Sequence, residues 1–347
     1  MKRLPYCQKC GAQLKEDDEY CSVCGTRVGL AGGLRLERRR HAWPAFPVFA
    51  LVAILVTATV IAAFLFIPIN PVKLARSEGI VYQSGITTLK LNLTTDIGRI
   101  NVNFENMPDK LVALNISATG GTTILAPPNP LNITFNHAVA GSTLTVASSI
   151  HRATAWTMPY GLNVVCDLYI NPSMKINVKA ETSVGSVHLD SEVAVVFESL
   201  TLRATTGQVE ATLEKATILG PVTLSTTTGG VSLALKNTTA PVSIPFTVKT
   251  TTGGIILDIQ QYTSLPANVT LNAEATTGGI DHTMTIHNGV AARITSETTI
   301  GGIAFTETGF NGSKALLFSD NYPTASNFDI SLKTTTGGVH TNATYTP

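Results

Sequence analysis

The stretch Val222-Thr-Leu-Ser-Thr-Thr-Thr-Gly-Gly-Val-Ser-Leu-Ala-Leu235 decides the fold of most of this chain. Apolar side chains alternate with polar ones on both sides of a central Thr-Thr-Gly-Gly sequence. Alternation with a period of two is typical of a strand with one buried face, and the glycines permit the positive φ angles that a turn needs. The stretch therefore predicts two strands joined by a turn.

The same pattern recurs through the rest of the C-terminal half. Copies contain Gly185, Gly207, Gly229, Gly253, Gly278, Gly301 and Gly337, at steps of 22, 22, 24, 25, 23 and 36 residues, and a looser copy contains Gly98. One unit cannot bury its apolar face alone, whereas copies stacked about 4.8 Å apart share a continuous core. We therefore expect a mostly β fold over residues 81–347, as a β-solenoid or a related repeat sheet that is less regular over residues 80–180. An ordinary β-sandwich is the alternative.

These copies resemble the cell-envelope β-repeat family of putative adhesins, also called toastrack domains, which accompany membrane-stress proteins of the Lia and phage-shock type. The likeness covers roughly residues 86–345 and rests on threonine, glycine and β-branched residues, so it bears on fold more than on function. It implies a membrane-tethered domain that senses, scaffolds or adheres at the cell surface. The repeat threonines are expected to cap their own turns, although a row of hydroxyls could instead bind glycan or ordered water.

An uncharged apolar run precedes the repeats. No residue from Ala42 to Val72 carries a formal charge. The twenty residues from Val48 to Ile67 would span about 30 Å as a helix, the thickness of the hydrocarbon core of a bilayer. The run predicts a transmembrane helix over residues 44–69, with a buried helix of a soluble domain as the alternative.

Charges near this run predict its orientation. Four arginines lie between residues 35 and 40, within a basic linker over residues 29–43, whereas only Lys73 and Arg76 follow closely after the run. Cytoplasmic flanks carry the excess of Lys and Arg. We therefore expect a single-pass protein of the plasma membrane with an uncleaved signal-anchor, a cytoplasmic N-terminus, a tether over residues 70–80 and an extracytoplasmic domain over residues 81–347.

The first 28 residues contain two Cys-x-x-Cys pairs, each followed by glycine. The cysteines are Cys7, Cys10, Cys21 and Cys24, and ten residues with an acidic tip at positions 16–18 separate the pairs. Four thiolates can converge tetrahedrally on Zn²⁺, and no open coordination position is evident, so we expect structural zinc. The segment resembles the short zinc ribbons at the N-termini of many prokaryotic membrane proteins. An iron site of rubredoxin type or redox-active pairs are the alternatives.

The remaining residues offer weaker signals. Cys166 lies in an apolar run and is expected to be a buried small side chain, so the outward domain would have no internal disulfide. Asp281-His282 is the nearest fragment of a catalytic triad, but no nucleophile motif accompanies it, and an exposed turn is the better interpretation. No catalytic residue is predicted. Sequons for N-glycosylation occur at Asn92, Asn115, Asn132, Asn237, Asn268, Asn311 and Asn342.

Together these features predict a membrane-anchored envelope protein that is not an enzyme. Its expected partners are the lipid bilayer and envelope glycans or proteins, a homo-oligomer stays open, and nucleic acid is disfavoured because the ribbon tip is acidic and the arginines lie beside the bilayer. Two alternatives remain. One is a membrane-tethered regulator whose ribbon contacts nucleic acid or a transcription complex through Lys2, Arg3, Lys9, Arg27 and the arginine cluster. The other is a carbohydrate-active β-helix enzyme.

Overall fold

The computed structural model describes residues 6–15, 18–27, 45–66, 70–123, 127, 129–153 and 162–347. The chain divides into two compact units, Met1–Val60 and Ile61–Pro347. The second unit holds all the named strands of the structure.

An α-helix, α1, spans Ala45–Phe66 and contains no charged residue. Its described side chains run from Phe49 to Ile61 and are exposed. The described part of the chain contains no helix long and apolar enough to cross a membrane. The helix expected over residues 44–69 is therefore present, but its membrane-spanning character is not supported.

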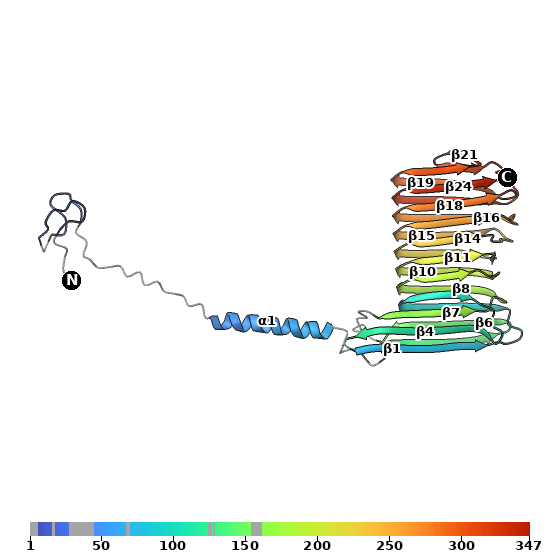
Figure 1. The fold of residues 1–347 in the computed structure, drawn as a ribbon, viewed down its shortest axis with the longest axis horizontal. Coiled ribbons are helices and arrows are strands. Elements are labelled where there is room, and N and C mark those ends of the chain that lie inside the picture. The colour runs from blue at the N-terminus through green and yellow to red at the C-terminus, as the bar shows by residue number, and fades with distance from the viewer. Residues whose placement is uncertain are drawn as a thin grey trace. The chain divides into compact units, whose positions relative to one another are not determined.

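Two large sheets make up the second unit (Figure 1). The first sheet contains, in spatial order, β1 (Asn70–Val81), β4 (Lys110–Thr122), β7 (Asn163–Ile170), β3 (Arg99–Phe104), β9 (Val187–Ser191), β11 (Val209–Glu214), β14 (Val231–Lys236), β16 (Ile255–Gln261), β18 (Ile280–His287), β24 (Val339–Thr346) and β20 (Ile303–Thr308).

The strands of the second sheet are stacked in the same direction, from the N-terminal end of the domain to the hairpin of β21 and β22. It contains β5 (Leu131–Ala140), β6 (Thr143–Arg152), β2 (Thr88–Ile97), β8 (Lys175–Val184), β10 (Val196–Thr206), β13 (Val222–Thr228), β15 (Ile244–Thr252), β17 (Val269–Thr277), β23 (Asn327–Thr336), β19 (Ala291–Ile300), β22 (Leu316–Ser319) and β21 (Phe310–Ser313), with β12 (Thr217–Ile218) beside β10.

Each Thr-Thr-Gly-Gly sequence carries the chain from the second sheet to the first. In the unit around Gly229, β13 pairs in parallel with β10 and β15, while β14 pairs in parallel with β11 and β16. An ordinary β-sandwich is antiparallel, so the expected stacked repeat is confirmed in its coarse form: a mostly β structure with parallel repeat units. A closed solenoid is not assigned.

The order of the units in space differs from their order in the sequence at the C-terminal end. The last unit, β23 and β24, lies between the unit of β17 and β18 and the unit of β19 and β20. The 36-residue step before Gly337 contains the antiparallel hairpin of β21 and β22, which pairs with β19 and ends the second sheet. The final segment of the chain is therefore an internal layer of the stack.

The first glycine of each unit is required by the stacking. Gly253 has φ +143°, and a Cβ at this position would lie 2.0 Å from the carbonyl oxygen of Gly229 in the neighbouring unit. No side chain fits at that distance. The second glycine is different, because a Cβ on Gly254 would lie 3.6 Å from its nearest neighbour, the carbonyl oxygen of Gly279.

Threonine side chains join neighbouring units by hydrogen bonds. The Thr250 hydroxyl donates to the carbonyl oxygen of Gly229 at 2.9 Å, and the Thr226 hydroxyl donates to that of Gly207 at 3.0 Å. Thr182, Thr298 and Thr334 make the equivalent bond at 3.3, 2.9 and 3.0 Å. The expectation that these threonines cap their own turns is wrong, because turns of adjacent units lie close enough for the hydroxyl to reach across.

The N-terminal end of the stack is less regular, as expected. β1, β4 and β7 pair antiparallel, and so do β5 and β6. Residues 70–80, expected to form a tether, make up most of β1, whose twelve residues pair with β4. Cys166 in β7 is fully buried, which fits the predicted small hydrophobic role. Burial, with a smaller contribution from Asp167, raises the pKa of its thiol to about 12.

Candidate metal centre

Two similar knuckles form the N-terminal ribbon. In the first, the backbone N–H of Gly11 donates to the carbonyl oxygen of Cys7, and in the second that of Gly25 donates to Cys21, both at 2.8 Å. These glycines have φ angles of +72° and +68°, which L side chains rarely adopt. The glycine after each cysteine pair thus closes the turn, as the spacing predicts.

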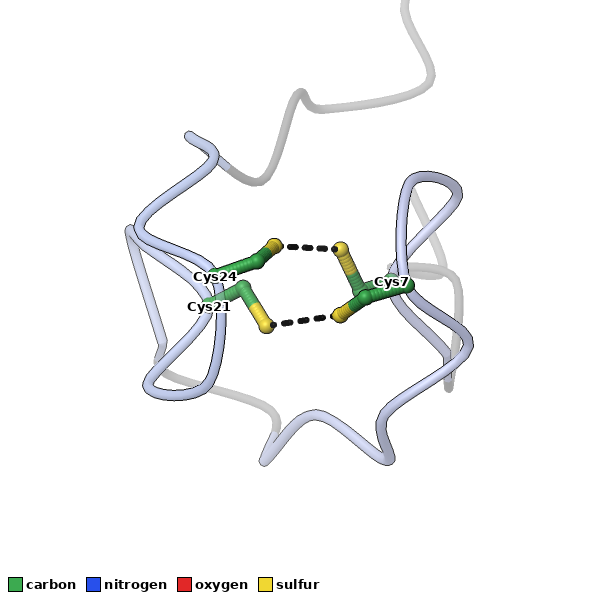
Figure 2. A group of neighbouring side chains, drawn as sticks. Cys7, Cys21 and Cys24 are labelled. Carbon is green, nitrogen blue, oxygen red and sulfur yellow. Dashed lines mark hydrogen bonds between the residues drawn. The ribbon is translucent and has the colours of Figure 1, made fainter.

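The knuckles bring the four cysteine sulfurs together (Figure 2). All four Sγ atoms lie within 4.8 Å of one another. Across the knuckles, the Sγ atoms of Cys7 and Cys24 are 3.6 Å apart, and those of Cys10 and Cys21 are also 3.6 Å apart. Four thiolates at a Zn–S distance of about 2.3 Å from one tetrahedral ion would be about 3.8 Å apart, so the observed spacing fits zinc.

Hydrogen-bond donors in the knuckles favour thiolates. The hydroxyl and the backbone N–H of Thr26 lower the pKa of Cys24 to about 6, and the Thr26 hydroxyl oxygen lies 3.2 Å from the Cys24 sulfur. The backbone N–H groups of Lys9 and Cys10 lower the pKa of Cys7. Thr26 is not predicted from the sequence, where its only signal is its place two residues after a cysteine.

Crowding has the opposite effect on one thiol. The backbone N–H of Ala12 lowers the pKa of Cys10, but the neighbouring Cys24 sulfur, burial and the other two sulfurs outweigh it and raise that pKa to about 12. Four sulfurs this close cannot all be thiolates without a compensating positive charge. A dication supplies that charge, and the donor set fits structural zinc; when bound, the ion would clasp the two knuckles together.

Several other predicted residues can be placed. Lys9 and Arg27 are exposed on the ribbon, and the Arg27 guanidinium lies 6.0 Å from the centre of the Tyr20 ring. Lys2, Arg3, Glu16, Asp17 and the arginines at 35–40 lie outside the described residues. Of the seven sequon asparagines, Asn237 is half-buried and the other six are exposed.

The expected exposed turn at Asp281-His282 is not observed. Both residues lie within β18, and because side chains alternate across a strand, Asp281 points outward while His282 is 1% exposed in the core. Neither ring nitrogen of His282 has a hydrogen-bond partner. Burial lowers its pKa to about 4. The structure therefore separates the two residues that a triad fragment would need on one face.

Comparisons with known proteins agree with the ribbon. A family model described as a zinc-ribbon domain matches residues 6–28. No curated protein matches the chain.

Among solved structures, the chain is similar to a putative cell adhesion protein from Clostridium sporogenes ATCC 15579, with 14% identity over 78% of this chain and 100% of that chain and a TM-score of 0.36. It is also similar to a putative adhesin from Bacteroides fragilis NCTC 9343, with 12% identity over 78% and 97% of the two chains and a TM-score of 0.35. At these TM-scores and identities the likeness defines neither the fold nor the function of this chain.

Proposed function

We propose that this chain is a single-pass cell-envelope protein whose repeat domain binds, scaffolds or senses envelope components outside the plasma membrane. In this arrangement the zinc ribbon lies in the cytoplasm and α1 is the anchor. The repeat domain acts by binding and carries out no catalysis.

The proposal rests on the order of three different segments along the chain: a cysteine cluster, an uncharged helix and a β-repeat domain. Four closely spaced thiols suit a reducing compartment. The uncharged α1 follows them, inside an uncharged run that extends from Ala42 to Val72. Beyond it lies a disulfide-free repeat domain that keeps its core by stacking, with Cys166 as a buried free thiol. Support for the membrane anchor thus comes from the sequence and from the charge-free composition of α1.

The outward faces of the repeat domain suit binding. In the second sheet the side chains form cross-strand ion pairs, such as Lys249 with Glu274 at 2.8 Å and Lys333 with Glu297 at 3.2 Å. These side chains are about half exposed, so the pairs contribute little to stability, at most about 1 kcal/mol each. They give a long, regular and polar surface of the kind that a scaffold or receptor presents.

Topology and binding can be tested separately. Carbonate washing should leave the protein in the membrane fraction, and protease added to intact cells should digest the repeat domain while leaving residues 1–40 intact. Full-length protein in detergent should sediment with purified cell envelopes. Release by carbonate would refute the anchor, and protein that stays in solution beside envelopes would refute the binding role. Salt-sensitive retention of DNA by the ribbon would favour the regulator instead.

A further inference from the structure

Three hollows lie in a row on the outer face of the first sheet. One, of about 310 Å³, lies over β1, β4 and β7, and the next, of about 430 Å³, lies over β7, β3, β9 and β11. Asp167 lines both. The third, of about 270 Å³, lies over β11, β14, β16 and β18 and shares Glu210 with the second. Consecutive hollows therefore adjoin at a shared residue, and the three together are called the trough.

The trough follows a single row of register partners. Asn115 of β4 lies opposite Asp167 of β7, and the row continues through Asn101, His188, Glu210 and Ser232, one residue per strand. It then reaches Ile256 and Asp281. From β1 to β18 the sheet has eight inter-strand steps, and at about 4.8 Å each the trough is about 38 Å long. A ligand that fills it must be an elongated polymer.

The row is a sequence of paired hydrogen-bonding groups. The Asn101 Nδ2 donates to Asp167 Oδ1 at 2.7 Å, the Ser77 hydroxyl donates to Asn115 Oδ1 at 2.7 Å, and His188 Nδ1 lies 2.5 Å from Glu210 Oε2. Each carboxylate or amide has more hydrogen-bonding capacity than one such bond uses. Ser77 and Asn115 are exposed, whereas the other four side chains of these pairs are half-buried. The pairs hold the half-buried side chains in position, so a ligand would not have to order them.

This chemistry suits hydroxyl groups. Amide and carboxylate groups side by side offer donors and acceptors, which match hydroxyls that both donate and accept. Tyr169, next to Asp167 on the outer face of β7, adds an aromatic surface in the middle hollow. Gly230 and Gly254 leave the floor of the third hollow without side chains. The backbone does not require glycine at either position, because neither has a left-handed φ and a Cβ would fit at both.

Charge narrows the class of polymer. The three hollows are lined by Asp167, Asp190, Glu210 and Asp281 against two arginines, Arg76 and Arg99. The carboxylates outnumber the guanidinium groups by two, which disfavours nucleic acid and acidic polysaccharides. An extended peptide usually adds to a free strand edge, whereas every strand of the trough except the edge strand β1 is paired on both sides.

We propose that the trough binds a linear neutral glycan laid across the strands of the first sheet. The proposal rests on the proposed function, because it names the class of envelope component that the repeat domain recognises. Sugar hydroxyls would contact the row from Asn115 to Asp281, and a sugar ring would lie on Tyr169.

Binding can be measured on the full chain in a detergent without a sugar head group. The probes are neutral hexasaccharides of glucose, mannose and N-acetylglucosamine, with hexagalacturonate as the acidic control, and calorimetry is the readout. We expect at least one neutral probe to bind and hexagalacturonate to bind at least tenfold more weakly. Binding of none of the neutral probes, or stronger binding of hexagalacturonate, would overturn the proposal.

A matched pair of variants locates the site. Ser232→Trp fills the trough from β14, whereas Thr223→Trp places the same ring on the outer face of β13 in the same repeat unit, and both positions are half-buried. Ser232→Trp should weaken binding at least tenfold and Thr223→Trp less than twofold, with equal thermal unfolding midpoints. Glu210→Gln, which keeps the shape of the side chain, should weaken binding at least threefold and covers the case in which Ser232→Trp does not fold.

Sedimentation with cell envelopes separates this proposal from the proposed function. If Ser232→Trp binds envelopes as well as the unchanged protein does, the repeat domain is still a receptor but the trough is not its site. If neither protein binds envelopes while glycan binding depends on Ser232, the trough stands and the envelope role fails.

Discussion

Replacing the first glycine of a Gly-Gly pair should strongly destabilise the fold, whereas replacing the second should change its stability little. The pair Gly253-Gly254 provides the comparison, because the two residues are adjacent and differ in their surroundings. A Cβ on Gly253 would lie 2.0 Å from the Gly229 oxygen and 2.5 Å from its carbonyl carbon, whereas a Cβ on Gly254 would meet only the Gly279 oxygen at 3.6 Å.

The magnitude follows from three contributions at Gly253. Carbon and oxygen normally approach to about 3.3 Å, so Gly253→Ala would have to separate two units by more than about 1 Å. That would break the bonds from Gly229 N to Thr252 O, at 2.8 Å, and from Val231 N to Gly254 O, at 3.0 Å, at about 1 kcal/mol each. An alanine at φ +143° adds about 1–3 kcal/mol of strain. The expected loss is about 3–5 kcal/mol.

Urea unfolding of the full-length protein, followed by far-ultraviolet circular dichroism, measures the difference. Gly253→Ala should lower the free energy of unfolding by about 3–5 kcal/mol or prevent folding. Gly254→Ala should change it by less than about 1 kcal/mol, because an alanine fits there and restricts the unfolded chain. Equal midpoints for the two variants would show that the contact between neighbouring turns does not govern stacking.

Three further outcomes are expected. Thr250→Val should lower the free energy of unfolding by about 1–2 kcal/mol, because it removes the hydroxyl that bonds the Gly229 oxygen, and the exposed Thr251→Val is the control in the same urea titration. The pKa of His282 is about 4 in the folded state and ordinarily 6.5, so the unfolded state takes up the proton first as the pH falls. The free energy of unfolding should therefore decrease by about 3 kcal/mol between about pH 6.5 and pH 4. Urea midpoints that fall as steeply in His282→Leu would contradict this. The native protein should contain one zinc ion per chain by metal analysis, and after chelation four thiols should react rapidly with a colorimetric thiol reagent, while the buried Cys166 should react only on unfolding; a fifth rapid thiol would contradict its burial.

The repeat could be predicted from the sequence because stacking demands the same residue in every unit. The first glycine recurs since no side chain fits between neighbouring turns. The cysteine knuckles were equally readable, because tetrahedral ligation fixes both residue type and spacing. Both features are local and repeated, so they leave a pattern along the chain.

Other features left no such pattern. The insertion of β23 and β24 between earlier units depends on pairing between strands that are far apart in sequence, such as β17 with β23. The core position of His282 went unrecognised because polar residues seldom occupy an inward strand position. The sequence predicts a tether in place of β1 because the pairing partner of this strand, β4, lies about forty residues further along the chain.

The trough illustrates why a repeat protein reveals its fold more readily than its binding site. Asn101, His188, Glu210 and Ser232 occupy one register row, one residue per unit, yet their side chains differ. Because stacking constrains the inward positions and the first glycine, the outward row is free to vary from unit to unit. A surface of this kind presents one side chain to a polymer about every 4.8 Å. Its specificity therefore resides in the residues that do not repeat, while the repeated residues maintain the strand register that places them in one row.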